Sequence, residues 1–149
     1  MANLQKVHSQ LEDLVEVLEH TARSLDQLSL TSKGPILLEI GDSLEGTIRE
    51  IKEIVSYQLN QFAGASRDVT PRREALQIIS GLSLDILDEL SSLRQHIQRF
   101  QSQSQLKKGL IQILDISSEI DYVTDSVKIL LRLARRMLSQ MTRLEVLTD

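Results

Sequence analysis

Apolar residues recur along the chain at alternating intervals of three and four positions, almost without a break from Leu4 to Leu147. This spacing places the apolar side chains along one side of a helix. The pattern predicts four amphipathic helices, and in the first of them Thr21 takes the one position where an apolar residue is missing. The apolar positions of that first segment are Leu4, Val7, Leu11, Leu14, Leu18, Leu25 and Leu28.

Interruptions of the rhythm set the predicted helix boundaries. Gly34 and Pro35 suit the end of one helix and the first position of the next. Thr70 suits the N-cap of the third helix, with Pro71 at its first position. The predicted helices span about residues 3–30, 35–62, 71–101 and 105–147.

The boundary between the last two helices has no glycine or proline. Ser102 and Gln105 have the spacing of a capping box, which favours a tight turn, and one continuous helix is the alternative. With a turn here, the fourth helix is the longest, and its last turns extend past the others by ~18 Å at 1.5 Å per residue. The apolar residues from Met137 to Leu147 then predict a surface that folds over the bundle or docks on another molecule.

Four amphipathic segments with short connections predict an all-α fold, an antiparallel up-down-up-down four-helix bundle with an overlong fourth helix. We expect residues 1–149 to form one domain, because this length suits a single core. The rhythm resembles that of a coiled coil. It does not distinguish a bundle closed within one chain from one closed between chains.

Composition narrows the classes of function. Aromatic residues make up 3% of the chain, which argues against base stacking, and the net charge of -4 argues against nucleic-acid binding. Residues 1–62 hold five basic against ten acidic residues, and the remainder holds twelve against eleven. Cysteine is absent. Because no apolar run reaches the ~20 residues of a transmembrane helix and the first residues lack a secretory signal, we expect a cytoplasmic protein.

A basic stretch within residues 127–144 carries five positive charges and no acidic residue. A cationic face beside a wide apolar face is typical of helices that lie on anionic membranes or enter the groove of a partner. In a second interpretation the apolar face belongs to the core and the arginines pair with the acidic first half of the chain. The residues predicted to contact a partner are Arg132, Arg135, Arg136, Met137, Leu138, Met141, Arg143, Leu144 and Leu147.

Acidic residues gather on the first two predicted helices, as Glu12, Asp13 and Glu16 and then as Glu39 and Asp42. This set resembles the signature of the all-α nucleoside triphosphate pyrophosphohydrolases of the MazG type. In that family a Glu-Glu-x-x-Glu on one helix and a Glu-x-x-Asp on the next hold Mg²⁺ against the phosphates. The resemblance covers roughly a third of the chain, and Asp13 stands where the family usually has glutamate. It implies these five residues as Mg²⁺ ligands, and a solvated acidic face is the other interpretation.

Four glycines, Gly41, Gly46, Gly81 and Gly109, fall inside predicted helices. Glycine in a helix interior costs ~1 kcal/mol relative to alanine. A bundle keeps this cost where two backbones approach closely or where a helix bends. In the other interpretation, these glycines lie at surface positions and have no structural role.

No catalytic arrangement stands out in the sequence. His8, His20 and His96 lie on separate turns, without the Glu-x-x-His spacing of di-metal bundles. The leading hypothesis is a non-enzymatic helical-bundle interaction module, an adaptor, assembly subunit or regulator, with no cofactor. It self-associates or binds a helical partner through its last helix. The alternatives are a Mg²⁺-dependent pyrophosphohydrolase and a protein that binds a membrane surface through the basic helix.

Overall fold

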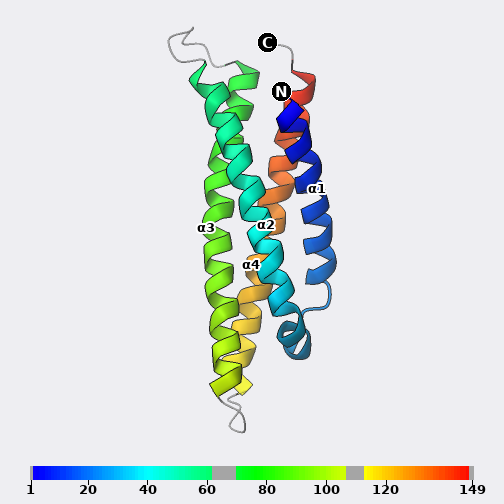
Figure 1. The fold of residues 1–149 in the computed structure, drawn as a ribbon, viewed down its shortest axis with the longest axis vertical. Helices are drawn as coiled ribbons and strands as arrows, with labels where there is room; N and C mark the ends of the chain where they lie inside the picture. The colour runs from blue at the N-terminus through cyan, green and yellow to red at the C-terminus, as the bar shows by residue number, and fades with distance from the viewer. Residues whose placement is uncertain (1, 62–69, 107–112, 148–149) are drawn as a thin grey trace.

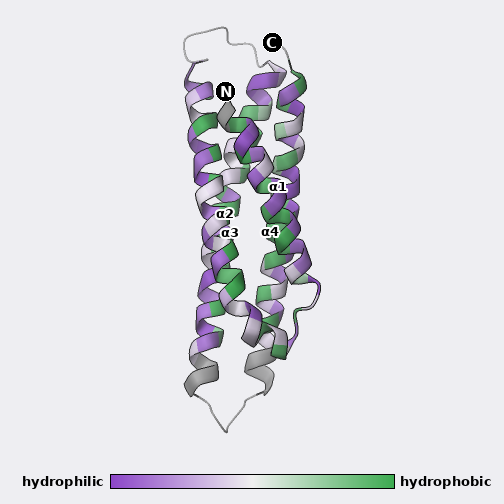
Figure 2. Cartoon of the chain, turned by 45° about the vertical axis from the view of Figure 1, so that its right-hand side comes forward, coloured by the Kyte–Doolittle hydropathy of each residue, from purple (hydrophilic) through white to green (hydrophobic). Residues whose placement is uncertain are grey.

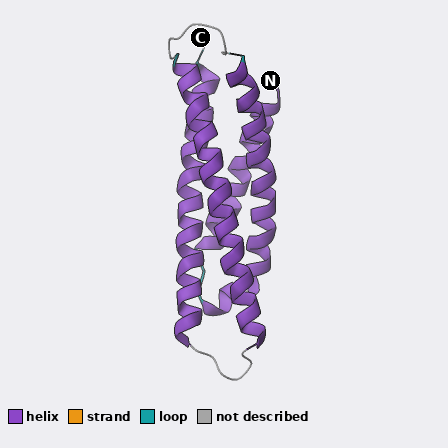
Figure 3. Ribbon diagram, turned by 90° about the vertical axis from the view of Figure 1, so that its left-hand side faces the viewer, coloured by secondary structure: helices purple, strands orange, loops and turns teal. Residues whose placement is uncertain are grey.

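The computed structural model describes residues 2–61, 70–106 and 113–147, and every element in these ranges is an α-helix (Figure 3). The prediction of an all-α helical bundle is confirmed. Figure 1 shows the helices side by side, with successive helices running in opposite directions. The helices are α1 (Ala2–Ala22), α2 (Gln27–Asn60), α3 (Pro71–Leu106) and α4 (Ile113–Val146).

The core is built from the apolar repeat of all four helices. Leucine, isoleucine and valine dominate it, and Phe100 is its one aromatic side chain among the described residues. Figure 2 shows hydrophobic and hydrophilic residues alternating along each helix, as the periodicity requires. The contact between α3 and α4 is the most extensive, whereas α2 and α4 lie diagonally and touch little. Burial of these apolar side chains is the main source of stability.

The first predicted boundary is wrong. α1 ends at Ala22 rather than near residue 30, and α2 begins at Gln27 and continues through Pro35. The reason is Asp26, an extended N-cap residue whose carboxylate accepts a 2.7 Å hydrogen bond from the Ser29 amide. The Lys33 ammonium also donates to the Ser24 hydroxyl across the turn. These local hydrogen bonds start the helix at Gln27, seven residues before Gly34, and an N-cap of this kind contributes about 1 kcal/mol.

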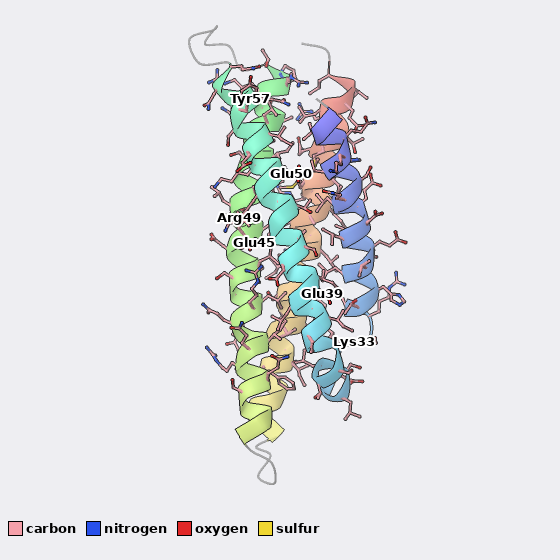
Figure 4. The ribbon with its side chains drawn as sticks, viewed as in Figure 1. Lys33, Glu39, Glu45, Arg49, Glu50 and Tyr57 are labelled. Atoms are coloured by element: carbon pink, nitrogen blue, oxygen red, sulfur yellow. The ribbon has the colours of Figure 1, made fainter. Side chains whose placement is uncertain are left out.

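Pro35 bends α2 instead of starting it. Its ring removes one backbone hydrogen bond and displaces the preceding turn, which is the usual cause of a sharp kink. Figure 1 shows the first turns of α2 at an angle to the rest, and Figure 4 places Lys33 beside this bend. Leu30, in the bent part, is 1% exposed. The bent start therefore adds its own side chain to the core at the end of the bundle where the shorter α1 has stopped.

The second predicted boundary is confirmed at the start of α3. Thr70 is the N-cap, and its hydroxyl accepts a 3.1 Å hydrogen bond from the amide of Arg73. The helix then begins at Pro71, as the sequence predicts. α2 ends at Asn60, close to the predicted residue 62, which lies outside the described residues. A threonine N-cap followed by proline is a local pattern, so the sequence alone was enough to predict this helix start.

The third predicted boundary is displaced. α3 continues through Ser102 to Leu106, so the proposed capping box lies inside a helix, and α4 begins at Ile113 instead of residue 105. Residues 107–112 lie outside the described residues. α3 and α4 pack side by side as a hairpin, which excludes the continuous helix. α4 has 34 residues against 36 in α3 and 34 in α2, so the described part of the chain does not show the expected overlong fourth helix.

The glycines inside helices divide into two environments. A Cβ atom added at Gly41 would lie 3.8 Å from Leu90 of α3, and one added at Gly34 would lie 3.5 Å from Ile97. At Gly46 and Gly81 an added Cβ atom would meet nothing within 4 Å. The close-approach interpretation therefore does not apply to Gly46 and Gly81, and Gly109 lies outside the described residues.

Replacing Gly46 or Gly81 by alanine is expected to raise the free energy of unfolding by about 1 kcal/mol each, because alanine restricts the unfolded chain and favours the helix. The two sites lie on different helices, so the effects should add in the double variant. Urea denaturation measures the change. Ser43→Ala, at an exposed position of α2, is the matched control and should gain about half as much. A loss of stability in either glycine variant would contradict the prediction.

Candidate partner-binding site

The basic stretch predicted from the sequence lies on α4, and its apolar side is core. Met137 is 0% exposed and Met141 is 1% exposed, and Leu144 is buried with them. Leu138 and Leu147 are partly buried and pack against the same core. Most of the expected free apolar surface is therefore buried, because α1 and α3 of the same chain cover the apolar side of α4, and Val146 at its end is 74% exposed. The three buried residues, Met137, Met141 and Leu144, can reach a partner only if the bundle opens.

The cationic residues of α4 point away from that core. Lys128, Arg132 and Arg136 are exposed and follow one another at intervals of four residues along one side of the helix. Arg135 is also exposed, and its guanidinium lies 2.8 Å from the carboxylate of Glu19 on α1. Within the described ranges, this is the one pairing between the basic stretch and the acidic first half of the chain that the second interpretation anticipated. We call Lys128, Arg132, Arg135 and Arg136 the basic face.

Three members of the basic face have no partner within the ranges that the structure describes. Lys128, Arg132 and Arg136 form neither an ion pair nor a hydrogen bond there. Like charges four residues apart on a helix destabilise it by ~0.2–0.5 kcal/mol per pair. The helix dipole does not offset this, because it acts within the last turn and Arg136 lies ten residues before the end of α4. The basic face is therefore an unfavourable local arrangement in the isolated chain.

A shallow hollow of about 470 Å³ lies on this part of α4. Leu131 and Ser139 line it together with the four residues of the basic face. Arg143, the remaining predicted arginine, is half-buried, and its guanidinium donates to the amide oxygen of Gln140 at 3.4 Å. Lys128 was not among the predicted contact residues, although its spacing from Arg132 was a visible signal.

The five predicted Mg²⁺ ligands do not converge. Glu12, Asp13 and Glu16 are exposed on α1, and the carboxylate of Glu12 lies 2.9 Å from the imidazole of His8. Asp42 lies on another flank of the bundle, 3.1 Å from the guanidinium of Arg94 on α3. Figure 4 shows Glu39 on α2. No three histidine or acidic side chains in the described ranges are grouped so that they could hold a metal ion.

A polar cluster between α3 and α4 was not predicted from the sequence. The imidazole Nδ1 of His96 lies 3.1 Å from the carboxylate of Glu119, and the ring stacks on Tyr122 with centroids 4.7 Å apart. Arg99 lies 3.6 Å from the same carboxylate, which is buried. Two turns away on each helix, the hydroxyl of Ser126 on α4 donates a 2.7 Å hydrogen bond to the carboxylate of Glu89 on α3. Together these pairs fix the register of the two helices.

A second polar cluster joins α2 to α3. The guanidinium of Arg94 contacts the carboxylate of Glu45 at 3.2 Å and donates to the backbone carbonyl of Gly41 at 3.3 Å. Arg49 lies 3.3 Å from the same carboxylate, and Figure 4 shows both Glu45 and Arg49 on α2. The hydrogen bond from Arg94, followed by its charge and that of Arg49, lowers the pKa of Glu45 below its ordinary value despite partial desolvation.

Acidification is expected to weaken this α2–α3 cluster. Because the pKa of Glu45 is lowered on folding, its stabilisation is present above the carboxyl pKa of the unfolded chain and is lost as the pH falls through the lowered value. The stability advantage of the wild type over Glu45→Gln, at most about 1 kcal/mol at neutral pH, should shrink as the pH falls through the ordinary glutamate pKa and then through the lowered pKa of Glu45. Glu50→Gln, exposed on the same helix, is the control. Urea denaturation as a function of pH measures both, and equal curves for the two variants would refute the expectation.

Comparison of the chain with protein-family models, with curated proteins and with solved structures finds no match. The geometry of the described residues is therefore the basis for assigning a site. Among those residues, no helix has a stretch that is long and apolar enough to cross a membrane. Charge, exposure and a hollow coincide on the basic face of α4, and other hollows lined by charged residues lie on α1 and α2. The basic face differs from them in carrying charge of one sign.

Proposed function

We propose that this chain is a non-enzymatic interaction module, an adaptor, assembly subunit or regulator, and that its partner docks on the basic face of α4. The observation that carries the proposal is the row of exposed cations at Lys128, Arg132 and Arg136, which have no carboxylate partner in the described part of the chain. An acidic helical segment has carboxylates at the same intervals of ~6 Å, four residues at 1.5 Å each. Its docking would replace repulsion with charge-assisted hydrogen bonds.

Arginine suits this role better than lysine does. Its planar guanidinium presents a fork of donors that matches a carboxylate, and it is weakly hydrated. Two of the three unpartnered cations are arginine. Leu131 lies in the hollow between them and offers a small apolar contact. Arginine and a central apolar contact are both typical of protein interfaces.

The alternatives receive less support from the geometry. Insertion of α4 into a membrane surface would have to expose Met137 and Met141, which are core residues. The pyrophosphohydrolase hypothesis needs its carboxylates on facing helices, whereas Glu12 is engaged by His8 and Asp42 by Arg94. A protein partner requires neither rearrangement, because the basic face is already exposed.

Site-specific photo-crosslinking tests the proposed function. A photoreactive amino acid at Ser139, which lines the hollow, should trap a protein partner in cells, and one at the exposed Ser43 of α2 should not. Charge reversal of the basic face by Arg132→Glu with Arg136→Glu should abolish the adduct. The matched control, Lys6→Glu with Lys52→Glu, changes the net charge equally and should retain it. Adducts of equal yield at both positions, or adducts that survive the reversal of the basic face, would refute the proposal.

A further inference from the structure

The solvent-facing side of α4 carries both signs of charge in separate halves. Asp121 and Asp125 precede the basic face, and Lys128, Arg132 and Arg136 follow. All five are exposed, and none forms an ion pair or hydrogen bond with another described residue. The helix dipole favours acids in the first turn and bases in the last, but these residues lie at least eight positions from either end of α4. The separation of charge therefore calls for an explanation outside the helix itself.

The four outermost charges form one stripe. At 3.6 residues per turn, Asp121, Asp125, Arg132 and Arg136 fall within a sector of about 60° around the helix axis. The midpoint of Asp125 and Arg132 lies between Lys128 and Ile129. The midpoint of Asp121 and Arg136 is the same point. The stripe is therefore antisymmetric in charge about its own centre.

From this pattern we infer that two copies of the chain pair antiparallel through α4, about a two-fold axis that passes next to Lys128 and Ile129. In that register Asp125 of each copy faces Arg132 of the other, and Asp121 faces Arg136. Each pair is made twice, as a two-fold interface requires. The inference rests on the proposed function and specifies the partner as a second copy of this chain.

Neighbouring residues agree with this register. Ile129, which is 37% exposed, lies beside the axis and supplies apolar contact at the centre. Ser118 and Ser139 are exposed on the same stripe, and the same midpoint relates them, so the ends of the contact carry small side chains. Every residue that the pairing uses is on the surface, so both copies can associate without any change in the core.

The same pattern disfavours other occupants of the stripe. A nucleic acid or an anionic membrane would meet Asp121 and Asp125 next to the arginines, and these carboxylates would repel its phosphates. A foreign acidic helix would pair with the arginines, but its other carboxylates would face Asp121 and Asp125 and repel them. A second copy pairs both aspartates with both arginines in one register, although it also brings the Lys128 side chains of the two copies near the axis. Charge complementarity therefore selects the antiparallel homodimer.

A charge-swap experiment tests the pairing by light scattering across a concentration series. The wild type should approach twice the chain mass of 16.9 kDa. Asp125→Arg and Arg132→Asp should each raise the dimer dissociation constant at least about tenfold, because like charges then face each other in both symmetric pairs. An equimolar mixture of the two variants should dimerise again, since one chain then offers only cations at these two positions and the other only anions. Asp13→Arg on α1 is the control and should dimerise like the wild type.

Three results would overturn the inference. They are a wild-type mass of 16.9 kDa at every concentration, a dimer that persists in Arg132→Asp, and a mixture of the two variants that stays monomeric. A wild-type helical circular-dichroism signal and a cooperative thermal transition verify that both variants are folded, while loss of the dimer itself is expected to lower their midpoint. If the wild type is monomeric but the Ser139 crosslink still traps a different protein through Arg132 and Arg136, self-pairing fails and the interaction module stands. If the wild type is monomeric and the Ser139 crosslink traps no protein, the self-pairing and the proposed interaction module are both refuted.

Discussion

Leu90→Ala is expected to lower the free energy of unfolding by about 2–5 kcal/mol, whereas Leu84→Ala, on the same helix, should change it by less than about 1 kcal/mol. The two leucines belong to α3, but Leu90 is 1% exposed and Leu84 is 49% exposed. Truncation of Leu90 removes apolar contacts and leaves a cavity. Its neighbour across the α2–α3 interface is Gly41, which has no side chain to move into that cavity.

Urea denaturation of both variants measures this difference, with unchanged m-values as evidence that the folded state keeps its compactness. Because the loss at Leu90 is a large fraction of the stability of a typical domain, it should also lower the thermal midpoint markedly. Similar losses in the two variants would mean that the apolar rhythm does not distinguish core from surface on α3. The packing described for this helix would then be incorrect.

Met137→Asp is expected to destabilise the protein by more than about 4 kcal/mol and to unfold much of the population at ordinary temperature. Met137 is fully buried on α4, and an aspartate there would place a carboxylate in an apolar core with no partner. Val17→Asp, at a position of α1 that is 48% exposed, is the control and should remain folded. Circular dichroism during heating measures both.

This variant also separates the two interpretations of the basic stretch. If Met137 were a partner-contact residue, Met137→Asp would keep its fold and lose only the partner. If Met137 is core, the helical signal is lost first, and Arg132→Glu with Arg136→Glu would lose the partner while the fold is retained. A stable, fully helical Met137→Asp protein would therefore refute the buried placement of this residue.

The apolar rhythm was sufficient to predict four helices and most of the core, because the period of a helix is a local property. The boundary near Gly34 and Pro35 was predicted wrongly for the same reason. Several local signals competed there, and the hydrogen bond from the Ser29 amide to Asp26 prevailed over the Gly-Pro pair. A proline inside a helix is tolerated when the helix can bend, and the bend depends on what the displaced turn packs against.

The candidate site was predicted in part. The exposure of Arg132 and Arg136 agrees with the prediction of a solvent-facing cationic surface. The sequence could not place Met137, because an apolar seam looks the same whether its partner is another helix of the chain or another molecule. The pair between His96 and Glu119 could not be predicted either. These residues are 23 positions apart, and whether they face each other depends on the register of α3 and α4.

The stack between His96 and Tyr122 has a spectroscopic consequence. The chain has no tryptophan and two tyrosines, and both tyrosines are exposed, so intrinsic emission carries little information about the core. Tyr122 nevertheless lies against a ring from the neighbouring helix, whereas Tyr57 has no such ring contact in the described ranges. A Tyr57→Phe chain would therefore hold a single tyrosine, Tyr122, whose emission should report whether the hairpin of α3 and α4 is closed.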